Sequence, residues 1–128
     1  MKLVMQVFQT NDALRPKGHY SQAIEHNGTI YCSGILPFDD ETGEFVTGDV
    51  TVQCKRVFRN LELILQACGI SKEQVIKTTV YIPDIKLWGE VDALYSAFFG
   101  DHKPCRSIVP TNTLHYGSNI EMEVVAVR

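Results

Sequence analysis

The stretch Thr51–Cys68, TVQCKRVFRNLELILQAC, carries the clearest helix signal in the sequence. Its apolar residues recur at steps of three and four, so they form one stripe along a helix: Cys54, Val57, Phe58, Leu61, Ile64, Leu65 and Cys68. Gly69 follows and is typical of the residue that ends a helix in the left-handed conformation. A helix with one apolar stripe must pack against a second layer, so the rest of the chain must supply that layer.

Strand signals lie on the C-terminal side of this helix and also before it. Val75–Ile82 is rich in β-branched and aromatic residues, and Pro83 stops it. Ser71 and Gln74 have the spacing of a capping box, which predicts one helical turn before that strand. The other predicted elements are a strand within residues 1–8, a hairpin of Tyr20–Glu25 and Thr29–Ser33 around Asn27-Gly28, a helix from Asp84 to Phe99 that ends at Gly100, a strand after Arg106 and a strand at Ile120–Val127.

This order of elements predicts an α+β fold. Two helices on one face of a mixed β-sheet give a two-layer sandwich. The length of 128 residues fits a single domain that spans residues 1–128. The open face of the sheet also carries apolar residues at alternate positions, so we expect a homo-oligomer to cover it.

Composition and charge argue against several classes of protein. A net charge of −3 disfavours nucleic-acid binding, which needs clustered lysine and arginine. No apolar run approaches the ~20 residues of a membrane span, and the first residues lack a signal-peptide pattern, so we expect no membrane association and a cytoplasmic protein. The histidines lack metal-ligand spacing, so no metal is expected. No C-x-x-C pair occurs, which favours free thiols at all four cysteines: Cys32, Cys54, Cys68 and Cys105.

Arg106, in the segment Lys103–Val109, is the first candidate for a binding residue. A guanidinium held on a strand pairs with both oxygens of a carboxylate or phosphate, because its planar fork matches them. A carboxylate on the neighbouring strand, Ile120–Val127, would then be placed for proton chemistry. The alternative is that Arg106 only pairs with Glu121 or Glu123 across a hairpin. The local pattern by itself favours that structural alternative.

Cys105 precedes Arg106 and therefore has to be considered as a nucleophile. Consecutive strand residues point to opposite faces, so we expect Cys105 to face the core if Arg106 faces a cleft. Buried cysteines are commonly inert packing residues. His115 is a partner only by its nearness in sequence, so cysteine catalysis is not favoured.

Several short motifs, taken in order, resemble the Rid family of enamine/imine deaminases, also called the YjgF or L-PSP family. The likeness runs from about Gly18 to the end of the sequence. The matching pieces are Gly18–Gln22, Ser33–Pro37 with Thr42–Glu44, Asn60, Ala67–Gly69, Val75–Tyr81, Tyr95–Phe99, Lys103–Ser107 and Ile120–Glu123. No piece is decisive alone, but their order and spacing make the combination specific.

The resemblance implies a chorismate-mutase-like fold and a homotrimer with substrate clefts between subunits. It implies hydrolysis of 2-enamino or 2-imino acids to 2-keto acids and ammonia, without a metal or organic cofactor. Arg106 would bind the substrate carboxylate, and Glu121 would position the hydrolytic water and accept its proton. By the same resemblance, the cleft contains Tyr20 and polar or backbone contacts from Ser33, Gly34 and Ile108.

The sequence departs from the family pattern at Ile35, Asp92, Ile108 and Pro110. Asp92 stands where an asparagine contributes to the cleft, and Ile108 stands where a cysteine follows the arginine. These departures keep a second function open, namely a module that binds keto acids or similar carboxylates without turnover. A third is the endoribonuclease activity attributed to some relatives, which the acidic net charge disfavours.

Overall fold

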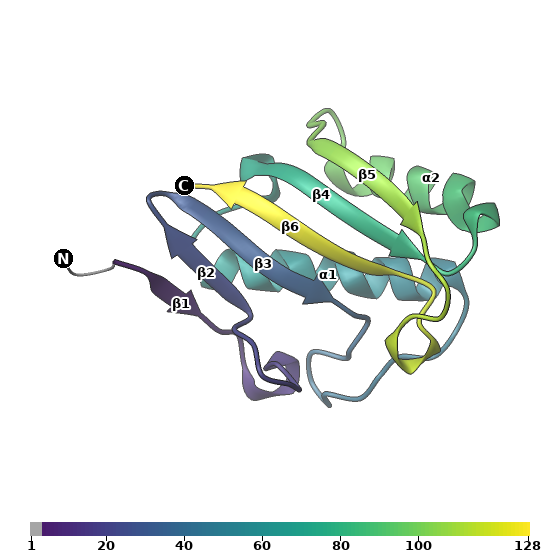
Figure 1. The fold of residues 1–128 in the computed structure, drawn as a ribbon, viewed down its shortest axis with the longest axis horizontal. Coiled ribbons are helices and arrows are strands. Elements are labelled where there is room, and N and C mark those ends of the chain that lie inside the picture. The colour runs from purple at the N-terminus through teal and green to yellow at the C-terminus, as the bar shows by residue number, and fades with distance from the viewer. Residues whose placement is uncertain (1–3) are drawn as a thin grey trace.

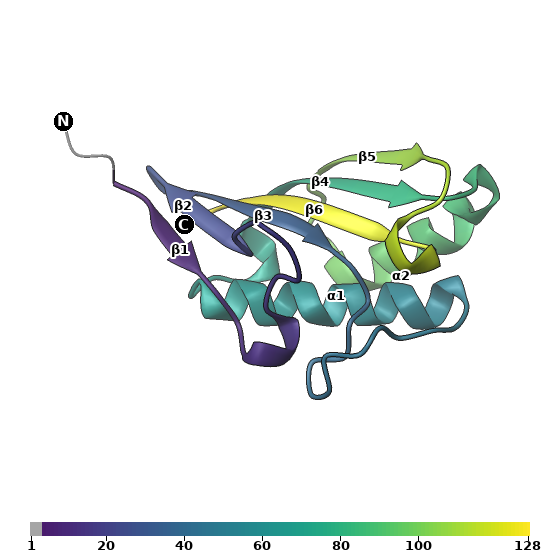
Figure 2. The same cartoon turned by 60° about the horizontal axis from the view of Figure 1, so that its bottom comes forward.

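The computed structural model describes residues 4–128, which form a six-stranded mixed sheet with two helices on one face (Figure 1). The strands are β1 Gln6–Phe8, β2 Ala23–His26, β3 Thr29–Ile35, β4 Val75–Ile82, β5 Cys105–Pro110 and β6 Glu121–Val127. The helices are α1 Val50–Ala67 and α2 Trp88–Phe99. Figure 2 shows both helices against the same face of the sheet, with the other face left open. The predicted two-layer α+β fold is confirmed.

The strands lie side by side in the order β1-β2-β3-β6-β4-β5. Every neighbouring pair is antiparallel except β4 and β5, which run parallel. Parallel neighbours need a crossover connection, and α2 supplies it between β4 and β5. The last strand in sequence, β6, therefore lies inside the sheet, whereas β5 forms its edge.

The hydrophobic core lies between the sheet and α1. Asp49 caps this helix, because its carboxylate accepts a hydrogen bond from the backbone N–H of Val52 at 3.0 Å. Asn60 is only 2% exposed and donates to the carbonyl oxygens of Leu36 (3.2 Å) and Phe38 (2.8 Å). This amide ties the loop after β3 to α1. The largest fully buried apolar side chains include Ile30, Leu61, Leu65, Ile82, Ile120 and Met122.

The predicted elements agree with the structure in place, and their ends differ by a few residues. The strand at Val75–Ile82 and the capping box of Ser71 and Gln74 are confirmed. The predicted second helix is divided, because a separate 3-10 turn, Ile85–Leu87, precedes α2. The predicted first strand partly falls on residues 1–3, which lie outside the described residues; β1 begins at Gln6.

One row of side chains crosses the open face from edge to edge. The strand registers align Val7, Ile24, Tyr31, Val125, Lys77 and Cys105, one from each strand. Paired residues point to the same side of a sheet, so this row shares one face. The row is mostly apolar, and Tyr31 is more than half exposed. Neither helix of the described chain is long and apolar enough to cross a membrane.

Candidate substrate site

Arg106 points toward the helix layer and not toward the open face. Thr78 of β4 pairs with Arg106 on one side and with Val124 of β6 on the other, so all three share a face. Val124 is buried in the core, which identifies that face as the one that the helices cover. Because β5 is the edge strand, the long side chain of Arg106 reaches past the sheet to α2.

Three residues of α2 fix the guanidinium group of Arg106. Its Nη1 donates to Oδ1 of Asp92 at 2.8 Å. The central carbon Cζ lies 4.7 Å from the ring centroid of Tyr95 and 5.5 Å from that of Trp88. These cation–π contacts and the ion pair hold the group in one orientation. Within residues 4–128, its remaining N–H groups have no hydrogen-bond partner.

A cavity of about 420 Å³ opens beside this arginine. Asp92, Tyr95 and Ser96 of α2 line it together with Phe99 and Gly100, and His102, Lys103, Pro104 and Arg106 complete the wall. The volume suits a small metabolite. Two basic residues, Lys103 and Arg106, and only one acidic residue, Asp92, line the cavity, so it favours an anionic ligand.

Glu121 lies on the opposite, open face of the sheet. It precedes the buried Met122 on β6, and consecutive strand residues alternate between faces. Burial raises the pKa of its carboxyl, the charge of Glu123 raises it further, and the charge of His115 acts in the lowering direction. A carboxylate with a raised pKa suits general acid–base chemistry near neutral pH.

Arg106 and Glu121 are therefore not neighbours within one chain. The expectation that the strand of Glu121 lies next to the strand of Arg106 is wrong, because β4 lies between β5 and β6. The structural alternative, an ion pair of Arg106 with Glu121 or Glu123, is also wrong. Arg106 pairs with Asp92, and Glu123 accepts a hydrogen bond from the hydroxyl of Tyr81. The sequence signal for this separation is the order strand, helix, strand in β4–α2–β5, because a helical crossover joins two strands that run parallel. β5 therefore pairs with β4 and not with β6.

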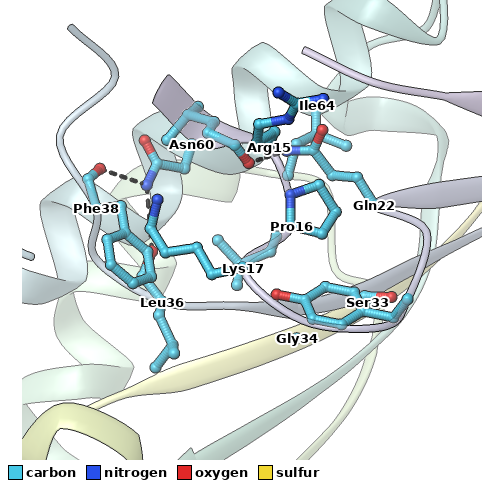
Figure 3. A pocket seen from close by; sticks show the side chains of 13 residues that line it. Arg15, Pro16, Lys17, Gln22, Ser33, Gly34, Leu36, Phe38, Asn60 and Ile64 are labelled. Carbon is cyan, nitrogen blue, oxygen red and sulfur yellow. Dashed lines mark hydrogen bonds between the residues drawn. The ribbon is translucent and has the colours of Figure 1, made fainter. Parts of the chain in front are cut away.

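Three other candidate residues line a second, smaller cavity of about 50 Å³ at the end of β3: Tyr20, Ser33 and Gly34. Figure 3 shows Lys17, Phe38 and Asn60 around one side of this space, with Gln22 and Ser33 on the other. The ammonium of Lys17 lies 4.6 Å from the ring centroid of Phe38. The hydroxyl of Ser33 donates to the carbonyl of Ser21 at 2.7 Å, and Tyr20 is 52% exposed.

The Gly34 backbone connects this small cavity with Glu121. A register shift in the pairing of β3 with β6 between Cys32 and Ile35 places two residues, Ser33 and Gly34, in the irregular segment. Gly34 lies so close to the carboxylate of Glu121 that a Cβ atom there would displace this carboxylate. The structure thus groups Tyr20, Ser33, Gly34 and Glu121 in one region, away from Arg106.

The remaining departures from the family pattern lie close to these two regions. Ile108 shares the helix-covered face with Arg106 and pairs with Val80. Pro110 pairs with Ile82 at the end of β5, and Ile35 is buried opposite Met122. Ile35 also lines the small cavity, Ile108 is partly buried against the core, and Pro110 is exposed.

Cys105 does not face the core. The prediction of a buried Cys105 is wrong, since this residue is exposed on the open face in the row with Lys77. The prediction assumed that a cleft and the core lie on opposite sides of the strand. At the edge strand β5 the cavity and the core lie on the same side of the sheet, because the side chain of Arg106 runs along the helix layer to reach the cavity. Among the described residues, no three His, Cys, Asp or Glu side chains gather as a metal site.

Sequence reasoning missed how α2 holds Arg106. The sequence marks Asp92 only as a departure from the family pattern. In the structure, Trp88, Asp92 and Tyr95 all reach the guanidinium group. The available signal was their spacing of three to four residues, which puts them on one side of a helix.

The fold and these two regions define a class: a two-layer α+β domain with an arginine-lined cavity at the sheet edge. The family described as endoribonuclease L-PSP matches residues 10–128. A RutC family protein of Pyrococcus abyssi is 40% identical over 126 residues, covering 98% of this chain and 99% of that one. The solved Rid family protein YyfA of Yersinia pestis has a TM-score of 0.93 at 34% identity, covering 98% of this chain and all of that one.

A relative with a named activity is similar over nearly the whole length. The human 2-iminobutanoate/2-iminopropanoate deaminase is 36% identical over 126 residues, which cover 98% of this chain and 92% of that one. The chain therefore belongs to the Rid family, also called the L-PSP family. The resemblance that the motifs indicated is confirmed.

Proposed function

We propose that this protein hydrolyses 2-imino and 2-enamino acids to 2-keto acids and ammonia without a cofactor. The observation that carries the proposal is the fixed guanidinium of Arg106 beside a cavity of about 420 Å³. A pre-oriented arginine with free N–H groups is a receptor for a substrate carboxylate. Membership of the Rid family and the name of the human relative support the same reaction class.

The reaction needs few groups from the protein. The enamine tautomerises to the imine, and Arg106 holds its carboxylate. Glu121 takes a proton from a water molecule, whose oxygen forms a bond to the imine carbon. The resulting carbinolamine is protonated on nitrogen, the C–N bond breaks, and ammonia leaves as the C=O bond forms. The raised pKa of Glu121 suits this role, because the same carboxyl accepts a proton and then returns it.

A complete site requires two copies of the chain. Arg106 lies on the helix-covered face at one edge of the sheet, whereas Glu121 lies on the open face. A single substrate molecule cannot span both faces of one sheet. We therefore propose that Arg106 and the Ile108 segment of one protomer meet Glu121, Gly34, Ser33 and Tyr20 of a neighbouring protomer. A cyclic assembly such as the predicted homotrimer creates this contact at every interface.

The first experiment tests turnover. An amino-acid oxidase generates 2-imino acids in situ, semicarbazide traps them, and the semicarbazone is followed by absorbance. We expect the wild type to suppress the semicarbazone signal and Arg106→Ala to lose that effect. Arg59→Ala removes an exposed arginine of α1 that lines neither cavity, and it serves as the control. No suppression with any side chain, together with saturable keto-acid binding, would make a carboxylate-binding module the leading function.

The second experiment tests the shared site. Arg106→Ala and Glu121→Ala are each expected to be inactive, and the two variants are mixed by unfolding and refolding them together. In a random mixture of equal parts, roughly a quarter of the interfaces join an intact Arg106 to an intact Glu121. We expect about that fraction of wild-type activity to return. Activity that stays at the level of the separate variants would contradict a site shared between protomers.

A further inference from the structure

We propose that the Asp92–Arg106 pair makes this site selective for zwitterions, so that it binds 2-imino acids with a protonated nitrogen in preference to 2-keto acids. This inference rests on the proposed function, because it takes Arg106 as the receptor of the substrate carboxylate. It adds a property that the reaction class does not itself require, namely discrimination between substrate and product by charge.

The pair presents a positive and a negative group side by side. Nη1 of Arg106 lies 2.8 Å from Oδ1 of Asp92, and both residues line the same cavity. Their side chains are 21% and 37% exposed, so both keep a surface toward the cavity. Within residues 4–128, Oδ2 of Asp92 accepts no hydrogen bond, and only one N–H of the guanidinium is used. Each partner therefore retains capacity for a ligand.

A protonated 2-imino acid carries the complementary pair of charges. Its carboxylate and its C=NH₂⁺ group sit on adjacent carbon atoms, with oxygen and nitrogen ~3 Å apart, close to the N···O spacing of an ion pair. The carboxylate can bind the free edge of Arg106 while the iminium donates to Oδ2 of Asp92. Both interactions are charge-assisted hydrogen bonds, which are stronger than neutral ones.

A 2-keto acid binds to the Asp92–Arg106 pair less favourably. It has no cation for Asp92, and its carboxylate has to approach a guanidinium whose charge Asp92 already offsets. Lys103 also lines the cavity and keeps it attractive to anions in general. Lys103 thus attracts anions in general, and Asp92 adds the discrimination between the imino acid and the keto acid.

Hydrolysis itself removes the group that Asp92 recognises. The balanced reaction is R₂C=NH₂⁺ + H₂O → R₂C=O + NH₄⁺, so the positive charge leaves with nitrogen. The product retains only its own carboxylate, and Oδ2 of Asp92, which the iminium contacted, now lacks a partner. The pair therefore favours release of the keto acid after each turnover.

The test measures binding of two stable ligands by titration calorimetry. The probe 2-oxobutanoate is the keto-acid product, and 2-aminobutanoate carries the ammonium that stands in for the iminium charge. They are titrated into the wild type, Asp92→Asn and Glu62→Gln. Glu62→Gln is the matched control, since it removes one exposed carboxylate of α1 in the same isosteric way.

We expect the wild type and Glu62→Gln to bind 2-aminobutanoate more tightly than 2-oxobutanoate. In Asp92→Asn the dissociation constant of 2-oxobutanoate should fall about tenfold and that of 2-aminobutanoate should rise, which reverses the preference. An equal change for both ligands, or no change, would overturn the inference even if the wild type deaminates imines. The arginine receptor and the proposed function fail together under two conditions. Neither ligand binds to the wild type, and Arg106→Ala alters neither ligand binding nor semicarbazone formation.

Discussion

A methyl group on Gly34 would lie 2.6 Å from Oε2 of Glu121 and 3.1 Å from its Cδ. No real side chain tolerates the shorter contact, so Glu121 would have to move. Gly34 lies in the irregular segment of β3 where the register against β6 shifts. The glycine therefore sets the position of the carboxylate that we assign to the hydrolytic water.

Gly34→Ala is expected to lower kcat/KM for imine hydrolysis by about 10- to 100-fold, because the displaced carboxylate no longer positions water. Thermal stability should change little, since the clash involves the flexible end of a side chain. The control is Gly89→Ala in α2, where an added Cβ meets no atom within 4 Å. Steady-state kinetics and thermal unfolding of both variants decide the matter. Full activity of Gly34→Ala would show that the position of Glu121 is unimportant.

Glu121→Gln should abolish the proposed imine hydrolysis and yet stabilise the protein near pH 7. Burial raises the pKa of this carboxyl in the folded state, so the unfolded chain ionises at lower pH than the folded one. The wild type then loses stability as the pH rises through the folded-state pKa of Glu121, whereas the Glu121→Gln variant does not. We expect a gain below about 1 kcal/mol, because the side chain keeps contact with water.

The measurement is urea unfolding of wild type and Glu121→Gln between pH 3.5 and pH 8. The two free energies of unfolding should coincide at the acid end and separate as the pH rises. Glu44→Gln, an exposed acid in the loop after β3, is the comparison variant. A difference that is constant across this pH range would contradict a raised pKa of Glu121.

Asn60→Ala should lower the free energy of unfolding by about 2 kcal/mol. The amide donates to the carbonyls of Leu36 and Phe38. Its loss leaves the Phe38 carbonyl without its partner from α1, whereas the Leu36 carbonyl still accepts from the backbone N–H of Phe38 at 2.9 Å. Gln66→Ala on the exposed side of α1 is the control and should change stability little. Urea midpoints at pH 7 provide the comparison. A loss below about 0.5 kcal/mol would mean that the loop after β3 relaxes without cost.

Thiol labelling should distinguish one cysteine from the other three. Burial raises the pKa of Cys32 and of Cys54 to about 12, and it also raises the pKa of Cys68. These thiols are protonated and inaccessible at pH 8, whereas Cys105 is exposed. A disulfide reagent should react quickly with one thiol in the native protein and with four in denaturant. Cys105→Ser should abolish the fast phase, and its persistence would contradict this assignment.

The sequence predicted the layers better than it predicted the site. Periodicity identified α1 because its apolar stripe repeats over five turns, and β-branched residues identified Val75–Ile82. These signals are local, so a single segment carries them. The break between the 3-10 turn at Ile85–Leu87 and α2 is finer than periodicity can resolve, because both turns carry similar residues.

The site depends on which strands become neighbours, which no local pattern contains. Arg106 and Glu121 were placed on adjacent strands because they are close in sequence. The parallel β4–β5 crossover instead inserts β4 between them. Cys105 was assigned to the core for the same reason, since its face depends on β5 being an edge strand. The ion pair with Asp92 likewise arises only when α2 packs beside that edge.

The central position of β6 affects the order in which the molecule can be assembled. β6 follows all other strands in sequence, yet it joins β3 to β4. Before β6 emerges from the ribosome, β1–β3 and β4–β5 are two separate half-sheets, each with an unpaired edge. Such edges bind other strands readily and promote aggregation. The sheet can therefore become continuous only when its last strand pairs with both halves in one long-range step.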